Sequence, residues 1–304
     1  MNPNVSIIYV NYHTSGLIQQ SIISIIEKVK DIDYEIIIVD NNSEKNLEEL
    51  FSDNIYSTVR IKYIQLPENI GFGRANNEGV KHAEGKYMFL LNPDTILLNN
   101  AVKILYDFLE ANPKVGACGG NLLSPDSTPA HSFRKIYPGI RWEFQEFTRH
   151  YFAHPFNKRA RFYNFTPDPM KVAYISGADL MIKKDIYIAS KGFPEDIFMY
   201  WDDVAICFQI EKLGYQIYSV PQARILHLES RSFDNLDKSF KTDLQEKFRI
   251  VYFKKYKDTF STSVSNFIYH LFLKSRIYGL PAGAKKDFYK KRLELFLKYK
   301  KSIN

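Results

Sequence analysis

The chain has 304 residues, of which 45% are hydrophobic, enough to bury the core of one large α/β domain or of two domains. Its two cysteines, Cys118 and Cys207, lie far apart without metal-ligand spacing, which argues against a disulfide framework and a structural zinc site. The first residues lack the pattern of a signal peptide, and no stretch reaches about 18 uninterrupted apolar residues. We therefore expect a cytoplasmic protein without a membrane span.

The net charge of +7 is concentrated near the C-terminal end. Residues 240–304 contain 16 Lys and Arg against 5 Asp and Glu, a net charge of +11, whereas residues 1–239 contain 25 against 29, a net charge of −4. This asymmetry indicates an anionic partner, either nucleic acid or the negatively charged cytoplasmic face of a membrane.

The first hundred residues alternate between strand and helix patterns. Two β-branched apolar runs, at 5–12 and 34–43, are typical of strands buried on both faces, and leucine and isoleucine recur at helical spacing between them. Further on we expect a helix near 46–51, a strand at 61–66, a helix at 73–83 and a strand at 86–91. The alternation predicts an α/β fold with a doubly wound, mostly parallel sheet flanked by helices.

Polar residues follow three of these strands: Asn11, Asp40 and Asp94. A carboxylate at the end of a buried strand, such as Asp94, needs a cation, hydrogen-bond donors or water to offset its desolvation. Each residue alone could equally cap a helix or close a turn. Together they predict a ligand-binding crevice, because ligands of doubly wound sheets bind beyond the carboxyl ends of the strands.

Two common phosphate-binding motifs are excluded. The segment GFGRANNEG, at 71–79, is rich in glycine, but it does not follow the first strand and has Asn76 where a dinucleotide fingerprint needs its third glycine. The P-loop pattern GxxxxGK[ST] is absent from the sequence.

Six segments in fixed order carry a resemblance to a known family. They are VSIIYVNY, IIIVDNNS, LPENIGFGRANNEG, YMFLLNPDT, SGADLMIKK and the run from Gly192 to His227. Together they resemble the inverting family 2 glycosyltransferases with a GT-A fold, and most closely the rhamnosyltransferase and galactofuranosyltransferase branch that builds bacterial surface polysaccharides. The resemblance covers about residues 5–233. It implies a GT-A catalytic domain over 1–239, with a nucleotide-binding half at 1–120 and an acceptor half at 121–239.

The resemblance also implies a divalent cation, Mg²⁺ or Mn²⁺, which would neutralise the departing diphosphate of a nucleotide sugar. Asp94 in NPDT resembles the last acid of the family's DxD element, and Asn92 stands where its first acid often is. His227 resembles the second metal ligand or a diphosphate contact. Without the resemblance to the family, a single histidine at this position could equally have a purely structural role.

Donor binding is assigned by the same resemblance. Asp40 resembles the residue that recognises the nucleotide base and ribose, since a carboxylate can accept hydrogen bonds from an imide or from ribose hydroxyls. Asp179 in SGADLMI is a candidate near the donor sugar. Further candidates for the same pocket are Asn11, Asn69, Arg74 and Asn76.

Paired carboxylates precede a helical pattern in WDDVAICFQIEKLGY. An inverting displacement needs a general base for the acceptor hydroxyl, and a nearby like charge raises the pKa of one acid of a pair, as suits a base. By resemblance we expect Asp203 to be the base and Asp202 its orienting partner, without excluding the reverse. The family commonly has a further acid where this chain has Ala205, so contacts inferred from that position do not carry over.

Two regions remain open. The stretch 122–172 mixes basic and aromatic residues, which suit acceptor loops, a contact with a lipid diphosphate, or ordinary core packing. Residues 240–304 form a basic, aromatic region with the spacing of amphipathic helices, typical of membrane-surface association but equally of packing on the catalytic domain or of homo-oligomerisation.

The sequence thus predicts a metal-dependent inverting glycosyltransferase of polysaccharide synthesis. It would move a rhamnose-like or galactofuranose-like sugar from a nucleoside diphosphate donor to a glycan or polyprenyl-diphosphate-linked glycan. Its location would be the cytoplasm, either free or peripheral on the inner face of the plasma membrane. The alternatives are a nucleic-acid-binding protein that uses the basic C-terminal region, and a sugar nucleotidyltransferase. For nucleic acid we expect no role, and the nucleotidyltransferase lacks a glycine- and basic-rich loop after its first strand.

Overall fold

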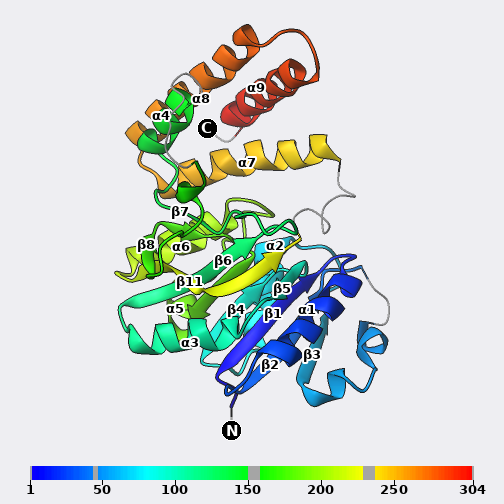
Figure 1. Ribbon diagram of the computed structural model, residues 1–304. Helices are drawn as coiled ribbons and strands as arrows, with labels where there is room; N and C mark the ends of the chain where they lie inside the picture. The colour runs from blue at the N-terminus through cyan, green and yellow to red at the C-terminus, as the bar shows by residue number, and fades with distance from the viewer. Residues whose placement is uncertain (1, 44–46, 150–157, 229–236, 303–304) are drawn as a thin grey trace. The chain divides into compact units, whose positions relative to one another are not determined.

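The computed structural model describes residues 2–43, 47–149, 158–228 and 237–302 (Figure 1). The chain divides into two units, each made of three segments. The first unit takes residues 1–135, 158–195 and 202–235, and the second takes 136–157, 196–201 and 236–304.

The first unit is built on a large sheet. Its strands occur in the spatial order β3-β2-β1-β4-β10-β6-β11-β5, with β8 added beside β11. A separate small sheet pairs β7 with β9. The strands are β1 (Val5–Asn11), β2 (Tyr34–Asp40), β3 (Arg60–Gln65), β4 (Tyr87–Leu91), β5 (Thr95–Leu97), β6 (Val115–Leu123), β7 (Phe133–Arg134), β8 (Met170–Val172), β9 (Tyr174–Ile175), β10 (Asp179–Lys183) and β11 (Gln216–His227).

The α/β fold class predicted from the sequence is confirmed. Strands β1 to β4 are mutually parallel, as the alternating pattern predicts. Beyond β4 the sheet is mixed, because β10 runs antiparallel to both β4 and β6, while β11 is parallel to β6 and antiparallel to β5 and β8. Residues 176–178 separate β9 from β10, and this interruption lies in the candidate site described below.

Helices cover both faces of this sheet. Helices α1 (Ser15–Lys28) and α3 (Ala101–Ala111) share one hydrophobic core with β1, β2 and β4, to which they contribute Ile22 and Leu105. Helix α2 (Phe72–Lys81) lies on the opposite face, where Gly79 packs directly on Ile8 and Val39. The other described helical segments of this unit are α5 (Lys184–Ala189), α6 (Asp202–Lys212) and the 3₁₀ turns η1 (Leu47–Phe51), η2 (Tyr56–Thr58) and η3 (Lys158–Arg161).

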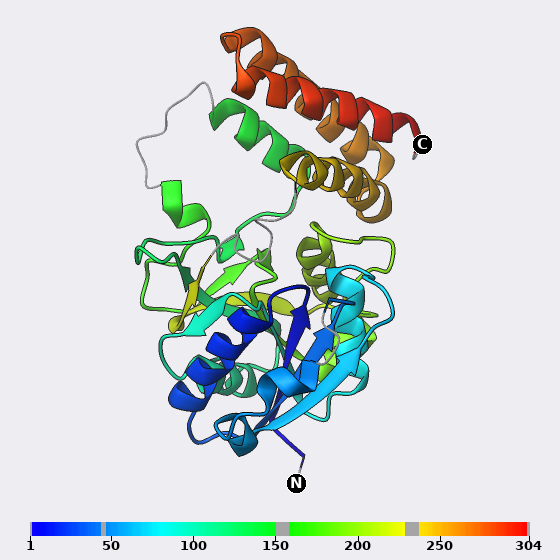
Figure 2. The same cartoon turned by 90° about the vertical axis from the view of Figure 1, so that its right-hand side faces the viewer.

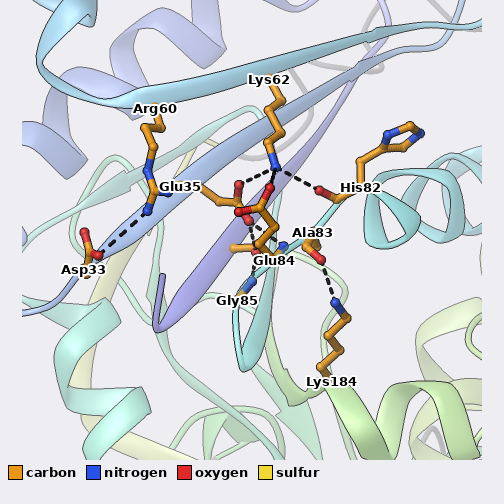
Figure 3. Close-up of polar contacts among 10 residues, drawn as sticks. Asp33, Glu35, Arg60, Lys62, His82, Ala83, Glu84, Gly85 and Lys184 are labelled. Carbon is orange, nitrogen blue, oxygen red and sulfur yellow. Dashed lines mark hydrogen bonds and ion pairs between the residues drawn. The ribbon is translucent and has the colours of Figure 1, made fainter. Parts of the chain in front are cut away.

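A buried carboxylate fastens the amino-terminal edge of the sheet (Figure 3). Glu35 accepts hydrogen bonds from the Ser6 hydroxyl at 2.6 Å and from the backbone N–H of Glu84 at 2.7 Å, and the Lys62 ammonium lies 3.0 Å from its second oxygen. Burial raises the pKa of Glu35, but these donors and the lysine outweigh burial and lower it. The Ser6 hydroxyl also accepts from the N–H of Gly85, so β1, β2 and the turn before β4 are joined at one point.

The second unit consists of helices α4 (Ile140–Arg149), α7 (Lys238–Tyr256), α8 (Thr259–Gly279) and α9 (Ala284–Ser302). Figure 2 shows α8 and α9 side by side, and both contribute to a core with α7. Inside it, Arg249 pairs with Glu143 at 2.7 Å, donates to Asn266 at 2.7 Å and stacks on the Tyr269 ring at 4.1 Å. Burial raises the pKa of Glu143, which the charge of Arg249 opposes.

Two further observations concern the helices and the cysteines of the described residues. None of its helices combines the length and the apolar character needed to cross a bilayer. Cys118 and Cys207 are both buried as free thiols.

Candidate active site

The carboxyl ends of β1 and β2 meet in a tight polar cluster. The Asn11 amide donates to Asp40 at 2.7 Å, and Asp40 also accepts from the Ser43 hydroxyl at 2.6 Å, the Ser43 N–H at 2.8 Å and the Gln65 amide at 2.6 Å. The side-chain oxygen of Asn11 in turn accepts from the N–H of Thr14, so it fixes the start of α1. Both oxygens of the buried Asp40 are thus occupied, and its first role is to shape the loop after β2.

Next to this cluster, an asparagine pair shapes the turn that begins α2. The Asn41 amide donates to the side-chain oxygen of Asn69 at 2.8 Å, and Asn41 accepts from the N–H of Ile70 at 2.9 Å. Gly71 follows with a φ of 90°, a left-handed conformation that suits glycine. Of the other two candidates here, Asn76 is buried in α2, where its amide donates to the Phe72 carbonyl, and Arg74 is exposed in its first turn.

The polar residues after β4 bring a carboxylate and an imidazole together. Asp94 is buried in the turn between β4 and β5, and His227 ends β11, which pairs with β5 so that His227 lies opposite Thr95. His227 Nε2 lies 3.3 Å from Asp94 Oδ1. No hydrogen bond forms between them, so this buried oxygen has no hydrogen-bond donor among the described residues. Asn92 is half-buried two positions before Asp94.

The Asp94 and His227 pair fits a divalent cation completed by substrate. A buried carboxylate oxygen without a donor is costly unless a cation compensates it, and carboxylate oxygen and imidazole nitrogen are both ligands of Mn²⁺-type ions. Within the described ranges no group of three or more His, Cys, Asp or Glu could hold a metal ion by itself. Such a pair therefore suits an ion that takes its remaining ligands from phosphate oxygens and water, as Mg²⁺-type sites commonly do.

A second histidine near this pair was not singled out by the sequence analysis. Burial, and then the nearby Arg134 and His227 side chains, lower the pKa of His131 to about 3, so it is neutral at physiological pH. Its Nε2 is buried without a hydrogen-bond partner in the described structure. The only signal in the sequence was its place within the basic, aromatic stretch 122–172.

The paired acids open α6. Asp203 is half-buried, and it accepts from the N–H of Val204 at 2.8 Å and from the N–H of Gly177 at 3.3 Å. Asp202 is buried, accepts from the N–H of Asp203 at 3.2 Å, and has its second oxygen without a donor among the described residues. Burial, and then the charge of Asp203, raises the pKa of Asp202, and burial raises that of Asp203. The pair therefore retains a proton to higher pH than isolated aspartates.

The interruption before β10 connects this pair to the end of β4. Gly177 contacts the Asp203 carboxylate, and the next residue, Ala178, accepts a hydrogen bond from the N–H of Asn92 at 3.0 Å. Gly177 also lies beside Phe72: a Cβ atom added to this glycine would be 3.5 Å from the phenylalanine ring. Except for Asp179, the residues predicted for donor, metal and base thus lie along one edge of the first unit, from the β1 end through α2 to α6.

Asp179 lies apart from the open part of this edge. It is fully buried at the start of β10, and one carboxylate oxygen accepts from the N–H of Gly120 in β6 at 2.6 Å. Desolvation by burial raises its pKa well above the ordinary value. Its other oxygen is buried without a partner within the described residues. A contact with the donor sugar stays a prediction.

With this geometry in place, the comparison with known sequences is informative. Residues 6–187 match the sequence profile of Glycosyl transferase family 2. An N-acetylglucosaminyl-diphospho-decaprenol L-rhamnosyltransferase of Mycobacterium tuberculosis is 24% identical over 189 residues, which are 58% of this chain and 61% of the relative. A poly-beta-1,6-N-acetyl-D-glucosamine synthase of Staphylococcus epidermidis is 30% identical over 117 residues, which are 38% of this chain and 28% of the relative. The chain therefore spans less than two thirds of the length of these relatives.

Solved structures share the fold. The structure of GalNAc-T7 with UDP, GalNAc and Mn²⁺ superposes with a TM-score of 0.64 and 15% identity, covering 99% of this chain and 56% of that one. The mannosyltransferase PcManGT of Pyrobaculum calidifontis, in complex with GDP-Man and Mn²⁺, gives a TM-score of 0.55 and 15% identity, covering 99% of this chain and 83% of that one. These likenesses confirm the GT-A type of fold predicted from the sequence.

Proposed function

Because this chain belongs to glycosyl transferase family 2, we propose that it transfers a sugar from a nucleoside diphosphate donor to a glycan acceptor with inversion at the anomeric carbon. One observation carries the proposal: the half-buried Asp203, with its raised pKa, is connected through Gly177 and Ala178 to the strand end that bears Asp94. This arrangement supports a base and a diphosphate site at one edge of the same sheet. The family match favours this activity over nucleic-acid binding or nucleotidyl transfer.

Asp203 is the proposed general base. It is more accessible than Asp202, and the two backbone N–H groups that it accepts from orient its carboxylate. In an inverting transfer it would take the proton of the acceptor hydroxyl as the oxygen attacks the anomeric carbon, while the bond to the diphosphate breaks on the opposite side. Asp202, whose pKa is raised by burial and by Asp203, would hold the pair's shared proton when Asp203 is ionised.

The proposed donor site lies over the ends of β1 and β2. Asp40 and Asn11 would position the base and ribose by fixing the loop that contains Ser43, and the loop held by Asn41 and Asn69 would border the same pocket. The exposed Arg74, at the first turn of α2, is the candidate phosphate contact, since an arginine presents several N–H donors to an anion. Asn76 would act only by supporting that turn.

Asp94 and His227 are the proposed protein ligands of a divalent cation, Mg²⁺ or Mn²⁺, with Asn92 near them. Such a cation, when bound, neutralises negative charge that develops on a departing diphosphate. Support comes from the buried Asp94 oxygen, which accepts no hydrogen bond from the described residues, and from the two solved neighbours with Mn²⁺.

The mycobacterial relative suggests the substrate class. We propose a rhamnose-like or galactofuranose-like donor sugar and an acceptor glycan linked to polyprenyl diphosphate at the inner face of the membrane, in the synthesis of a surface polysaccharide. The polysaccharide synthase relative is in keeping with that pathway class.

The test is a thermal-shift panel of thymidine, uridine and guanosine diphosphate sugars, each with and without Mn²⁺, followed by transfer to lipid-linked N-acetylglucosamine. We expect one nucleotide class to raise the unfolding temperature, and to do so more strongly with Mn²⁺. Asp94→Asn and His227→Ala should abolish the Mn²⁺-dependent part of the shift. Asp107→Asn, which removes an exposed carboxylate paired with Lys103 on α3, is the matched control. Equal shifts for the site variants and wild type would contradict the metal assignment, and transfer of phosphate or nucleotide instead of sugar would contradict the function.

A further inference from the structure

Four large apolar side chains are exposed on one side of α8. Phe260, Phe267, Leu271 and Tyr278 are 72%, 62%, 40% and 80% exposed, respectively. They are seven, four and seven residues apart, so that at 3.6 residues per turn all four lie within about 20° of one direction around the helix axis and extend over about 27 Å. We call these four residues the α8 ridge.

The α8 ridge lies on the side of α8 opposite the residues that this helix buries in the core of its unit. Tyr269, nine residues from both Phe260 and Tyr278, lies about half a turn away from the ridge, and it is buried in the core of the second unit together with Leu273. Helix α8 therefore has two apolar faces, of which only one packs within its own unit. Contiguous exposed apolar side chains of this size usually mark an interaction surface.

The C-terminal segment that carries the ridge is mostly basic. Helix α8 contains Lys274 and Arg276 but no Asp or Glu, and residues 259–304 carry ten Lys and Arg against two Asp and Glu, a net charge of +8. Helix α9, which packs alongside α8 (Figure 2), places further lysines in solvent: Lys285, Lys290, Lys291, Lys298, Lys300 and Lys301.

This combination selects among possible partners. A second copy of the chain in a symmetric contact would bring the same basic surface against itself, and the like charges would oppose association. A nucleic acid would match the charge but not the row of exposed aromatic and aliphatic side chains. The surface of an anionic bilayer matches both, because apolar side chains enter the interface while lysines remain among the headgroups. No described helix is apolar enough to span a bilayer, so α8 would lie on the surface.

We infer that the α8 ridge docks this chain onto anionic lipid, with Phe260, Phe267, Leu271 and Tyr278 in the interface and the lysines of α8 and α9 at the headgroups. This docking surface is compatible with a lipid-linked acceptor. It does not depend on the proposed transfer reaction, because it rests on the exposure and charge of α8 and α9 alone.

The test is sedimentation of the full chain with phosphatidylcholine vesicles, with and without about 30 mol % phosphatidylglycerol, without nucleotide or acceptor. We expect binding to the anionic vesicles only, weakened by salt. The double substitution Phe267→Ser and Leu271→Ser should lower the bound fraction at least about tenfold, because both side chains leave the interface. Lys274→Glu should lower binding at low salt and have little effect at high salt, where charge is screened.

Ile188→Ser is the matched control, because Ile188 is also a well exposed apolar residue but belongs to the first unit. It should bind vesicles as wild type does, and all variants should keep the wild-type circular dichroism spectrum and unfolding temperature. The inference is overturned if wild type fails to bind anionic vesicles, or if the ridge variant binds them equally well. It is also overturned if the ridge variant turns a dimer into a monomer while vesicle binding is unchanged, since a second copy would then be the occupant.

Discussion

The backbone N–H of Gly177 donates a hydrogen bond to the carboxylate of Asp203 at 3.3 Å. Gly177 lies in the interruption that precedes β10, and Asp203 lies in the first turn of α6, so the contact fixes the acid against the sheet edge that carries Asn92 and Asp94. A carboxylate held in this way is preorganised, and its chemistry should be sensitive to small changes in its own charge.

We predict that Asp203→Asn lowers kcat by about 10²–10⁴-fold, the usual contribution of a general base, while the KM for the donor stays nearly constant. The amide keeps the size of the side chain, and loss of a buried charge should leave the unfolding temperature equal or higher. Steady-state kinetics with the donor identified by thermal shift would measure this. Asp107→Asn should behave as wild type, and a variant at Asp203 that retained full kcat would exclude it as the base.

The pH dependence should report the interaction between Asp202 and Asp203. Because burial raises the pKa of Asp203, kcat/KM should fall on the acidic side at a pH above that of an ordinary aspartate, where the base becomes protonated. Asp202→Asn removes a neighbouring negative charge, which should lower the pKa of Asp203 and shift this acidic limb to lower pH. A pH–rate profile that Asp202→Asn left in place, or moved to higher pH, would contradict the coupling.

The Glu35 contacts predict a specific loss of stability in acid. Since the pKa of Glu35 is lowered from about 4.5, its contribution is fully present above that pH and is lost as the pH falls through the lowered value. Glu35→Gln should reduce the free energy of unfolding by about 1–3 kcal/mol at pH 7 and by less near pH 3, as measured by urea unfolding.

Glu84 provides the matched control for that measurement, because it contacts the same Lys62 from a half-exposed position. Glu84→Gln should change the free energy of unfolding by less than about 0.5 kcal/mol at either pH. If the two variants were equally stable, Glu35 would not be the residue that fastens β1, β2 and the turn before β4.

In the second unit, replacing one partner of the buried ion pair should destabilise the fold more than replacing both partners. Arg249→Met leaves Glu143 buried without its partner, which typically costs about 3–5 kcal/mol. The double variant Arg249→Met and Glu143→Leu should recover most of this loss. Hydrogen exchange of the α7 and α8 amides would measure both effects within this unit. Lys255→Met, at a half-exposed pair with Asp196, should change exchange little, and a double variant no better than the single one would contradict the argument.

The first half of the sheet could be predicted because its signal is local. Apolar runs buried on both faces, β-branched in β1 and β2, identify β1, β2 and β4, and helical spacing identifies α1 and α2. The direction of β10 could not be predicted in this way. It depends on pairing with β4 and β6, which are far from it in the sequence, and no pattern within SGADLMI distinguishes a parallel from an antiparallel neighbour.

In the candidate site, too, the sequence predicts what depends on a local pattern and not what depends on contacts between distant segments. NPDT and the Asp202 and Asp203 pair stand out in the sequence because polar residues interrupt apolar runs. Hydrogen-bond partners do not stand out in the sequence. Asp40 accepts hydrogen bonds from Asn11, Ser43 and Gln65, and these contacts form only because separate segments of the chain meet. Nor does the sequence show that Arg249, within the basic C-terminal region, is buried against Glu143, because this burial depends on the aromatic rings and the acid that surround it.

The second unit is assembled from residues 136–157, 196–201 and 236–304, so the backbone enters and leaves it repeatedly. Removing everything after residue 235 would strip α4 of the helices it packs on and leave its apolar side exposed to the chaperones and proteases of the host. Exchanging this helical module between related enzymes would therefore require three coordinated splices, and a single cut-and-paste at the C-terminus would yield an insoluble product.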